Sequence, residues 1–302
     1  MPRRYAILDV FADRPLAGNP LAVVMDADGL ETARMQAIAR EFNLSETVFV
    51  LPPDNPMHSA RIRIFTPAAE LRFAGHPTVG IAVMLALEKV AGAAGRHEMV
   101  LVVEEEIGAV RCGVFVAEAG AGHAIFDAPR LPEAIAVRLD RDLLAVALGL
   151  SPAEIGFENH QPSAFSAGLA YGFVPVRNIE VIARAAPNLP AWDAAFAATA
   201  GAAYLYCRET EAVDRQFHAR MFASGPGMTE DPATGSAAAA FAGVVKRFDE
   251  PTAGGHRVVI EQGFEIGRPS LMTLEFDVED GDLSAVRVGG DAVVVAEGML
   301  DV

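Results

Sequence analysis

The stretch from Pro77 to about Val90, "PTVGIAVMLALEKV", predicts a helix that is apolar on nearly every side. A helix on a protein surface carries a polar face, so a helix without one belongs inside a shell of other elements. With about 14 residues it is also shorter than the ~18 needed to cross a membrane. The chain therefore has to fold around this helix, and that requirement limits its architecture more than any other feature.

The elements around this helix recur in the same order in the second half of the chain. The segment "QFHARMFAS" at 216–224 resembles "ARIRIFTP" at 60–67, and each leads through a loop to an apolar helix that opens on proline. The strand pair after each helix contains Glu-Ile-Gly, at 106–108 and again at 265–267. A repeated order of this kind indicates an internal duplication. We predict an α+β fold of two pseudo-symmetric lobes, each a mostly antiparallel, barrel-like sheet around a central helix.

Chain length and one glycine-rich segment predict the domain boundary. A chain of 302 residues fits one large domain or two of ordinary size. The segment "AGAGH" at 119–123 is typical of a linker. We therefore expect a first lobe at 1–122 and a second at 123–291.

Composition narrows the class of protein. The chain is 52% hydrophobic and carries a net charge of -16, which disfavours binding to nucleic acid or to a membrane surface. Cys112 and Cys207 are too few for a disulfide framework and predict reduced thiols in a cytoplasmic protein. The start of the chain, "MPRRYAILDVFAD", is typical of a first strand and not of a signal peptide.

The two apolar helices open in an unusual way. Proline is common at the first helical position, and the residue before it is then the cap: His76 in the first half and Asp231 in the second. Aspartate is a common N-cap, whereas histidine is not favoured there and titrates near neutral pH. Each residue therefore has a structural interpretation, as a cap or a satisfied buried ring, beside a functional one.

If the two lobes are similar, their helix starts can converge on one cleft. Helix N-termini carry unsatisfied N–H groups and a partial positive charge, which suits a substrate carboxylate. Backbone or side-chain donors for it would be the following residues: Gly75, Thr234, Gly235 and Ser236. The alternative role for the glycines is close packing of the helices.

Glu46, in "NLSETVFV", follows a predicted helix and begins a predicted strand, where a side chain can be aimed at a cleft. Its alternative role is that of a solvated loop carboxylate. Three other glutamates compete with it on these grounds: Glu41, Glu70 and Glu230.

Five segments together resemble the signatures of the phenazine-biosynthesis PhzF-like family. They are "DVFADRPLAGNPLAVV", "AREFNLSETVFV", "IRIFTPAAELRFAGHPTVG", "RMFASGPGMTEDPATGSAAAA" and "EQGFEIGRPS", and they cover the chain from residue 9 to about 270. The resemblance implies the fold of diaminopimelate epimerase, with the active site between two lobes and the last strand, within 292–302, returning to the first. It also implies a homodimer.

The resemblance further implies catalytic roles for Glu46, His76 and Asp231, and Asn19 in the first segment is a candidate for binding the substrate. The best-known member of the family moves a proton between carbons of a dihydro-hydroxyanthranilate, without a metal or an organic cofactor. A carboxyl shielded from water has a raised pKa, which suits Glu46 to carry that proton. We therefore expect a cofactor-independent isomerase of a small carboxylate-bearing metabolite.

The sequence departs from the family and its relatives in two places. Arg72 stands where the family pattern has proline, and it either contacts an acidic substrate or points to solvent. Related epimerases use a cysteine pair at the two helix starts, but Cys112 and Cys207 fall in predicted strands outside both motifs. A two-thiol racemase is therefore disfavoured.

Two alternatives to this isomerase remain. An amino- or hydroxy-acid epimerase would use the same scaffold but needs bases on both faces of the carbon, and a non-catalytic protein would bind a small molecule in the same cleft. A serine hydrolase built on Ser236 is disfavoured, because "ATGSAAA" is not a nucleophile elbow and the sequence indicates no base for it.

Overall fold

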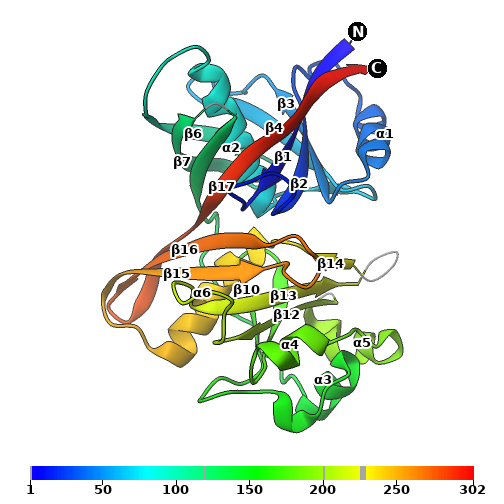
Figure 1. The fold of residues 1–302 in the computed structure, drawn as a ribbon, viewed down its shortest axis with the longest axis vertical. Helices are drawn as coiled ribbons and strands as arrows, with labels where there is room; N and C mark the ends of the chain where they lie inside the picture. Colours follow the sequence, from blue (N-terminus) through cyan, green and yellow to red (C-terminus); the bar gives the residue numbers. More distant parts are fainter. Residues whose placement is uncertain (1, 119, 200, 225–228) are drawn as a thin grey trace. The chain divides into compact units, whose positions relative to one another are not determined.

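The computed structural model describes residues 2–118, 120–199, 201–224 and 229–302, and the chain divides into two compact units (Figure 1). One unit extends to Pro129 and also contains Gly289–Val302, and the other is Arg130–Val288. The division falls later than the expected residue 122, because a strand at Ala121–Asp127 pairs with the preceding strand of the first unit. The predicted linker at 119–123 is therefore largely strand, with residue 119 outside the described residues.

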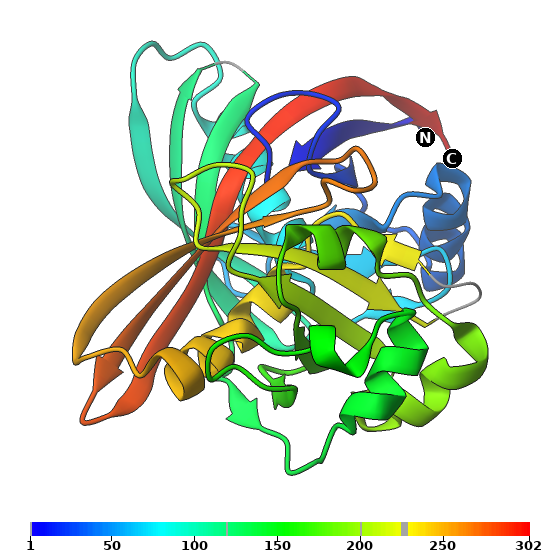
Figure 2. The same cartoon turned by 60° about the horizontal axis from the view of Figure 1, so that its bottom comes forward.

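Eight strands of the first unit close into a barrel. Their pairing runs β1–β2–β3–β4–β6–β7–β8–β17 and returns from β17 to β1. The strands are β1 (Pro2–Val10), β2 (Asn19–Val24), β3 (Glu46–Leu51), β4 (Ala60–Phe65), β6 (His97–Glu105), β7 (Gly108–Glu118), β8 (Ala121–Asp127) and the last part of β17 (Asp282–Asp301). Because β1 and β17 pair from Pro2↔Asp301 onward, the two ends of the chain lie side by side (Figures 1 and 2).

The apolar helix lies inside this barrel. Helix α2 (Gly75–Lys89) packs against six of the barrel strands, and its residues from Gly75 to Ala86 are buried. At Gly80 the approach is close, because a Cβ there would lie 2.5 Å from Cδ2 of Leu21. The prediction of an enclosed helix is confirmed.

Two further elements complete the first unit. Helix α1 (Thr32–Phe42) lies against β3 and β4 and buries Met35, Ile38 and Ala39 in a separate apolar cluster. The short strand β5 (Glu70–Leu71) pairs with the end of β4 and leads into α2.

The second unit is built on a curved sheet with helices on its two faces. Its strands are β9 (Glu133–Ala134), β10 (Ser163–Ser166), β11 (Ala170–Pro175), β12 (Ala202–Cys207), β13 (Phe217–Ala223), β14 (Thr229–Asp231), β15 (Gly254–Gln262), β16 (Ser270–Glu279) and the first part of β17. Helix α6 (Gly235–Asp249) packs on β10, β11 and β16.

The other face of that sheet is covered by three shorter helices, drawn in green in Figure 2. They are α3 (Arg141–Leu148), α4 (Ile179–Arg184) and α5 (Leu189–Phe196), with 3₁₀ turns at Pro152–Glu154 and Ala197–Thr199. Trp192, Phe196 and Phe222 are among the buried side chains of this layer.

The two units repeat one pairing scheme. In the first unit, three strand pairs are antiparallel, β3–β4, β4–β5 and β6–β7, and one is parallel, β4–β6. The second unit has the same set: the antiparallel pairs are β12–β13, β13–β14 and β15–β16, and the parallel pair is β13–β15. The helices α2 and α6 each have 15 residues and occupy the same place in that order. The predicted α+β fold of two pseudo-symmetric, mostly antiparallel lobes is confirmed. Within the described residues, no helix is both long and apolar enough to span a membrane.

Candidate active site

Glu46 and His76 meet at one end of the barrel. Glu46 is the first residue of β3, and His76 lies in the first turn of α2. Oε2 of Glu46 lies 3.1 Å from Nε2 of His76, and their side chains are only 16% and 5% exposed. The structure thus brings together two of the three predicted catalytic residues.

His76 is neutral at this place. Burial lowers the pKa of the imidazole to about 3, so the ring carries no charge near neutral pH. The contact with Glu46 is therefore between a carboxyl group and a neutral ring, and it is not an ion pair. A neutral imidazole has one donor and one acceptor nitrogen, so it can orient a partner on either side.

Asn19 and Gly75 belong to the same end of the first unit. Asn19 begins β2 and is fully buried, and β2 runs parallel to β3 with Leu21 opposite Glu46. Gly75 is the first residue of α2, next to His76. All four sites that the sequence predicted in this unit therefore lie at neighbouring strand and helix starts.

The helix starts differ from the prediction that His76 and Asp231 are N-caps. The N-cap of α2 is Ala74, and His76 is already inside the helix. The N-cap of α6 is Thr234, and Asp231 is the last residue of β14. The prediction was wrong because it took both prolines as first helical residues. Pro77 lies in the first turn of α2, whereas Pro232 lies in the link between β14 and α6, and proline is tolerated at both positions.

Asp231 is tied to the start of α6 by two neighbours. The hydroxyl of Thr234 donates to Oδ2 of Asp231 at 2.5 Å. The amide of Gln262 donates to the backbone oxygen of Asp231 at 2.7 Å and to Oγ1 of Thr234 at 3.1 Å. The third predicted catalytic residue is thus held in the second unit by a short network at the helix start.

Gly235 and Ser236 form the first turn of α6. Oγ of Ser236 lies 2.7 Å from the hydroxyl of Tyr171, which comes from β11 and is 4% exposed. Sequence reasoning gave no role to Tyr171 or Gln262. Gln262 lies in the recognised segment "EQGFEIGRPS", but nothing near Tyr171 in the sequence signals its place at the helix start.

The repeat sets up a different correspondence from the predicted one. Leu71 pairs with Ile64 on β4, and Asp231 pairs with Met221 on β13, at equivalent positions of the two ladders. Each helix begins four residues later, at Gly75 and at Gly235 (71 to 75, 231 to 235). By this topology the counterpart of His76 is Ser236, and the counterpart of Asp231 is Leu71.

The competing glutamates occupy other places. Glu70 makes a two-bond ion pair with Arg63, and Glu230 makes the equivalent pair with Arg220. Glu41 is exposed on α1. Among these four glutamates, Glu46 is the one in contact with His76.

The structure also shows where Arg72 and the two cysteines lie. The side chain of Arg72 is 70% exposed and pairs with Glu106 at 3.0 Å. Cys112 lies in β7 and Cys207 in β12, both free and buried. Burial raises the pKa of the Cys207 thiol to about 12 and that of Cys112 further still, so neither is a ready thiolate.

No group of three or more metal-ligating side chains gathers within the described parts of the chain.

Comparison with known proteins gives one consistent result. The family model of the phenazine biosynthesis-like protein matches residues 8–298. An uncharacterized isomerase of Mesorhizobium japonicum is 52% identical over 99% of this chain and 98% of its own length. A trans-2,3-dihydro-3-hydroxyanthranilate isomerase of Pseudomonas fluorescens is 37% identical, with 98% of each chain covered.

Solved structures agree. A phenazine biosynthesis protein of the PhzF family from Bacillus anthracis superposes with a TM-score of 0.87 and 27% identity, over 100% of both chains. A hydroxyproline epimerase from Agrobacterium vitis, with 10% identity, superposes with a TM-score of 0.61 over 99% of this chain and 92% of its own, and shares the fold alone.

Proposed function

Because the chain belongs to the phenazine biosynthesis-like (PhzF) family and is an isomerase, we propose that it moves a proton between two carbons of a small carboxylate-bearing metabolite, with Glu46 as general acid and base. The observation that carries this proposal is the buried contact between Glu46 and a neutral His76. A carboxyl group in such surroundings can take a proton and return it without leaving the site.

The proposed step is balanced within the substrate. Glu46 removes a proton from one carbon, the electron pair of that C–H bond shifts along the conjugated system, and Glu46 returns the proton to another carbon. No electron leaves the substrate, and the proposal includes no cofactor. His76 orients the reacting group through a ring nitrogen.

The substrate carboxylate is assigned to the N–H groups at the helix starts. The first turn of α6, at Gly235 and Ser236, offers N–H groups that have no partner inside the helix, and the helix dipole favours an anion there. Asp231 is assigned to a substrate amine or hydroxyl. We include both helix starts in one active site, as the family resemblance implies.

The Glu46→Gln variant tests the proposal. With trans-2,3-dihydro-3-hydroxyanthranilate as probe in D₂O, the wild type should place deuterium on carbon, and the variant should lose that exchange by about 10²–10⁴-fold. Its thermal stability should stay within about 1 kcal/mol. Glu41→Gln, an exposed change on the neighbouring helix, is the matched control.

The other outcomes separate the alternatives. Full exchange by Glu46→Gln rejects Glu46 as the base. Exchange that only inverts a stereocentre indicates an epimerase. Stabilisation of the protein by the probe without any exchange indicates a binding protein.

Location and assembly are part of the same proposal. The two free, buried cysteines support a cytoplasmic location, and the family resemblance supports a homodimer. Light scattering of the purified protein tests the dimer, and a monomer mass at micromolar concentration contradicts it.

A further inference from the structure

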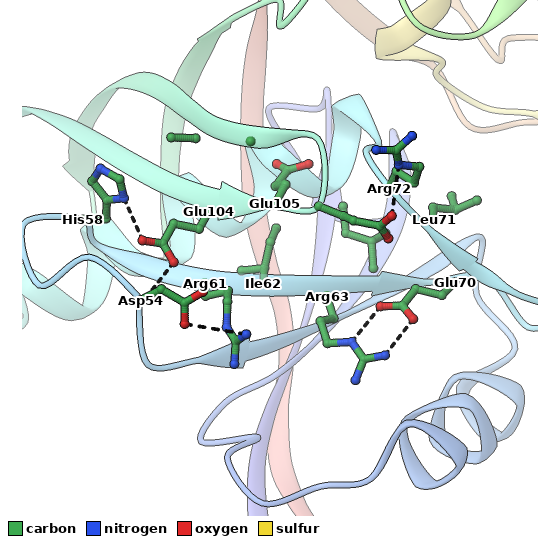
Figure 3. A pocket seen from close by; sticks show the side chains of 14 residues that line it. Asp54, His58, Arg61, Ile62, Arg63, Glu70, Leu71, Arg72, Glu104 and Glu105 are labelled. Atoms are coloured by element: carbon green, nitrogen blue, oxygen red, sulfur yellow. Dashed lines mark hydrogen bonds and ion pairs between the residues drawn. The ribbon is translucent and has the colours of Figure 1, made fainter.

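Glu105, the last residue of β6, is a buried carboxyl group that no motif singled out. It is 8% exposed and lines a pocket of about 580 Å³ beside β4 (Figure 3). Its neighbour Glu104 lines the same pocket, but its carboxylate is directed toward His58 and accepts hydrogen bonds from the backbone N–H groups of residues 54 and 55 (Figure 3). The carboxylate of Glu104 is therefore surrounded by donors, whereas the carboxyl group of Glu105 is buried against Thr78.

The repeat gives Glu105 a counterpart in the second unit. In the first unit, Glu104 on β6 pairs with Arg61 on β4. In the second unit, Glu261 on β15 pairs with His218 on β13 at the equivalent position. The residue after each is Glu105 in one unit and Gln262 in the other. Gln262 ties the end of β14 to the start of α6 by donating two hydrogen bonds from its amide. A glutamate at the equivalent position can donate in this way only when it is protonated.

The contacts of Thr78 call for such a proton. Its hydroxyl Oγ1 lies 2.8 Å from the backbone oxygen of Ala74 and 2.7 Å from Oε1 of Glu105. A threonine hydroxyl has one hydrogen, so it cannot donate to both oxygens. If Glu105 is protonated on Oε1, it donates to Thr78, and Thr78 donates to Ala74. The hydroxyl of Thr78, the carbonyl of Ala74 and Oε1 of Glu105 then each take part in a hydrogen bond with a hydrogen to share.

We propose that Glu105 is a protonated carboxylic acid in the folded protein and that its hydrogen bond through Thr78 to Ala74 positions the start of α2 and with it His76. Glu105 is thus a positioning residue. Its effect on catalysis rests on the proposed function above, whereas its protonation does not.

The surroundings of Glu105 favour the neutral form. Burial raises the pKa of this carboxyl group to about 8 against the opposing effect of Thr78, and its Oε2 has no hydrogen-bond partner among the residues that the structure describes. Among the described residues, no cation forms an ion pair with this carboxyl group. The titratable groups on the enclosed side are the neutral His76 on α2, the buried thiol of Cys112 on β7 and Asp127 on β8. Three arginines line the same pocket, and each pairs with another carboxylate: Arg61 with Asp54, Arg63 with Glu70 and Arg72 with Glu106.

The first experiment compares infrared spectra of the wild type, Glu105→Gln and Glu106→Gln. Glu106 is the exposed neighbour and serves as the control. At neutral pH the wild type and Glu106→Gln should show the stretch of a protonated carboxyl group that Glu105→Gln lacks, and this band should vanish as the pH rises through about 8. If the wild type and Glu105→Gln do not differ there, Glu105 is ionised and the proposal is overturned.

The second experiment tests the positioning role. Glu105→Gln retains an N–H donor toward Thr78, whereas Glu105→Leu does not. We expect Glu105→Leu to shift the ring resonances of His76 in NMR spectra and to lower kcat/KM on the probe substrate by about tenfold to a hundredfold. Wild-type activity should fall as the pH rises through about 8, because Glu105 then loses the proton that it donates to Thr78. Glu105→Gln should keep near wild-type values at neutral pH and should not show this alkaline fall.

The two readouts keep the hypotheses apart. Unchanged His76 resonances in a folded Glu105→Leu protein overturn the positioning role. If the resonances shift as expected but the wild type has no activity, the proposed function fails and the positioning role stands.

Discussion

The Nε2 atom of His76 lies 3.1 Å from Oε2 of Glu46, although the two residues enter from different elements. Glu46 comes from the start of a barrel strand and His76 from the first turn of the helix that the barrel encloses. Because the barrel excludes water from this place, the ring is held neutral beside the carboxyl group. The barrel that encloses α2 therefore also ensures that Glu46 has a neutral ring, and not a positive charge, beside its carboxyl group.

The neutral ring of His76 predicts how stability depends on pH. The pKa of His76 is lowered to about 3 in the folded protein, against about 6.5 in an unfolded chain. As the pH falls below that unfolded value, the unfolded chain takes up a proton that the folded ring refuses, so stability is lost down to about pH 3. Between about pH 7 and about pH 4, the His76→Gln variant should lose up to about 3 kcal/mol less than the wild type.

Urea unfolding at the two pH values measures this difference. His123→Gln is the control, because that ring is 36% exposed and pairs with Asp291. Equal losses in the wild type and His76→Gln would show that His76 is charged in the folded state.

Tyr171 is predicted to support Ser236 at the start of α6. Its hydroxyl lies 2.7 Å from Oγ of Ser236, and its ring is buried with its centroid 6.3 Å from that of Phe173. In Tyr171→Phe, Ser236 loses this partner and its hydroxyl is free to turn, so kcat/KM should fall by about tenfold. Unfolding free energy should fall by only about 0.5–1.5 kcal/mol, the net value of one hydrogen bond.

Steady-state kinetics and thermal unfolding of the same preparations separate these effects. Tyr5→Phe, a change on a barrel strand of the first unit, should leave both values unchanged. A Tyr171→Phe enzyme with wild-type kcat/KM would remove Tyr171 from the site.

The fold was predictable because its two strongest signals are local. An all-apolar helix requires an enclosing shell, and the repeated order of elements shows in the sequence without knowledge of any long-range contact. Glu46 could likewise be placed at a strand start from its neighbours alone. These inferences depend on periodicity and order, which neighbouring residues determine.

The correspondence between the two helix starts was not predictable in the same way. Aligning Pro77 with Pro232 matched His76 to Asp231, whereas the strand ladders match His76 to Ser236. Register is set by pairing between strands far apart in the sequence, and a proline fits both a first helical turn and the link before one. Tyr171 and Gln262 reach the helix start by the same long-range pairing. Gln262 lies in a recognised segment, but that segment does not show what it contacts, and no motif marks Tyr171.

The duplicated arginine–glutamate pairs allow a comparison within one molecule. Arg63–Glu70 and Arg220–Glu230 each make two hydrogen bonds, and each guanidinium also lies over a phenylalanine, Phe65 or Phe222. The first pair is 27% and 30% exposed, the second only 9% and 11%. Arg220 also donates to the backbone oxygens of residues 182, 183 and 185.

Removing one partner should therefore cost much more in the second unit. Arg220→Met leaves a buried carboxylate and three carbonyl groups without their donor, and we expect a loss of about 3–5 kcal/mol in unfolding free energy. Arg63→Met leaves a carboxylate that water can reach, and the loss should be about 1 kcal/mol or less. Urea unfolding of both variants measures the two losses.

Adding Glu230→Leu to Arg220→Met should restore part of the stability, because the carboxylate that lost its partner is then no longer buried. Similar losses for the two single variants, or no recovery in the double variant, would show that burial does not set the strength of these pairs.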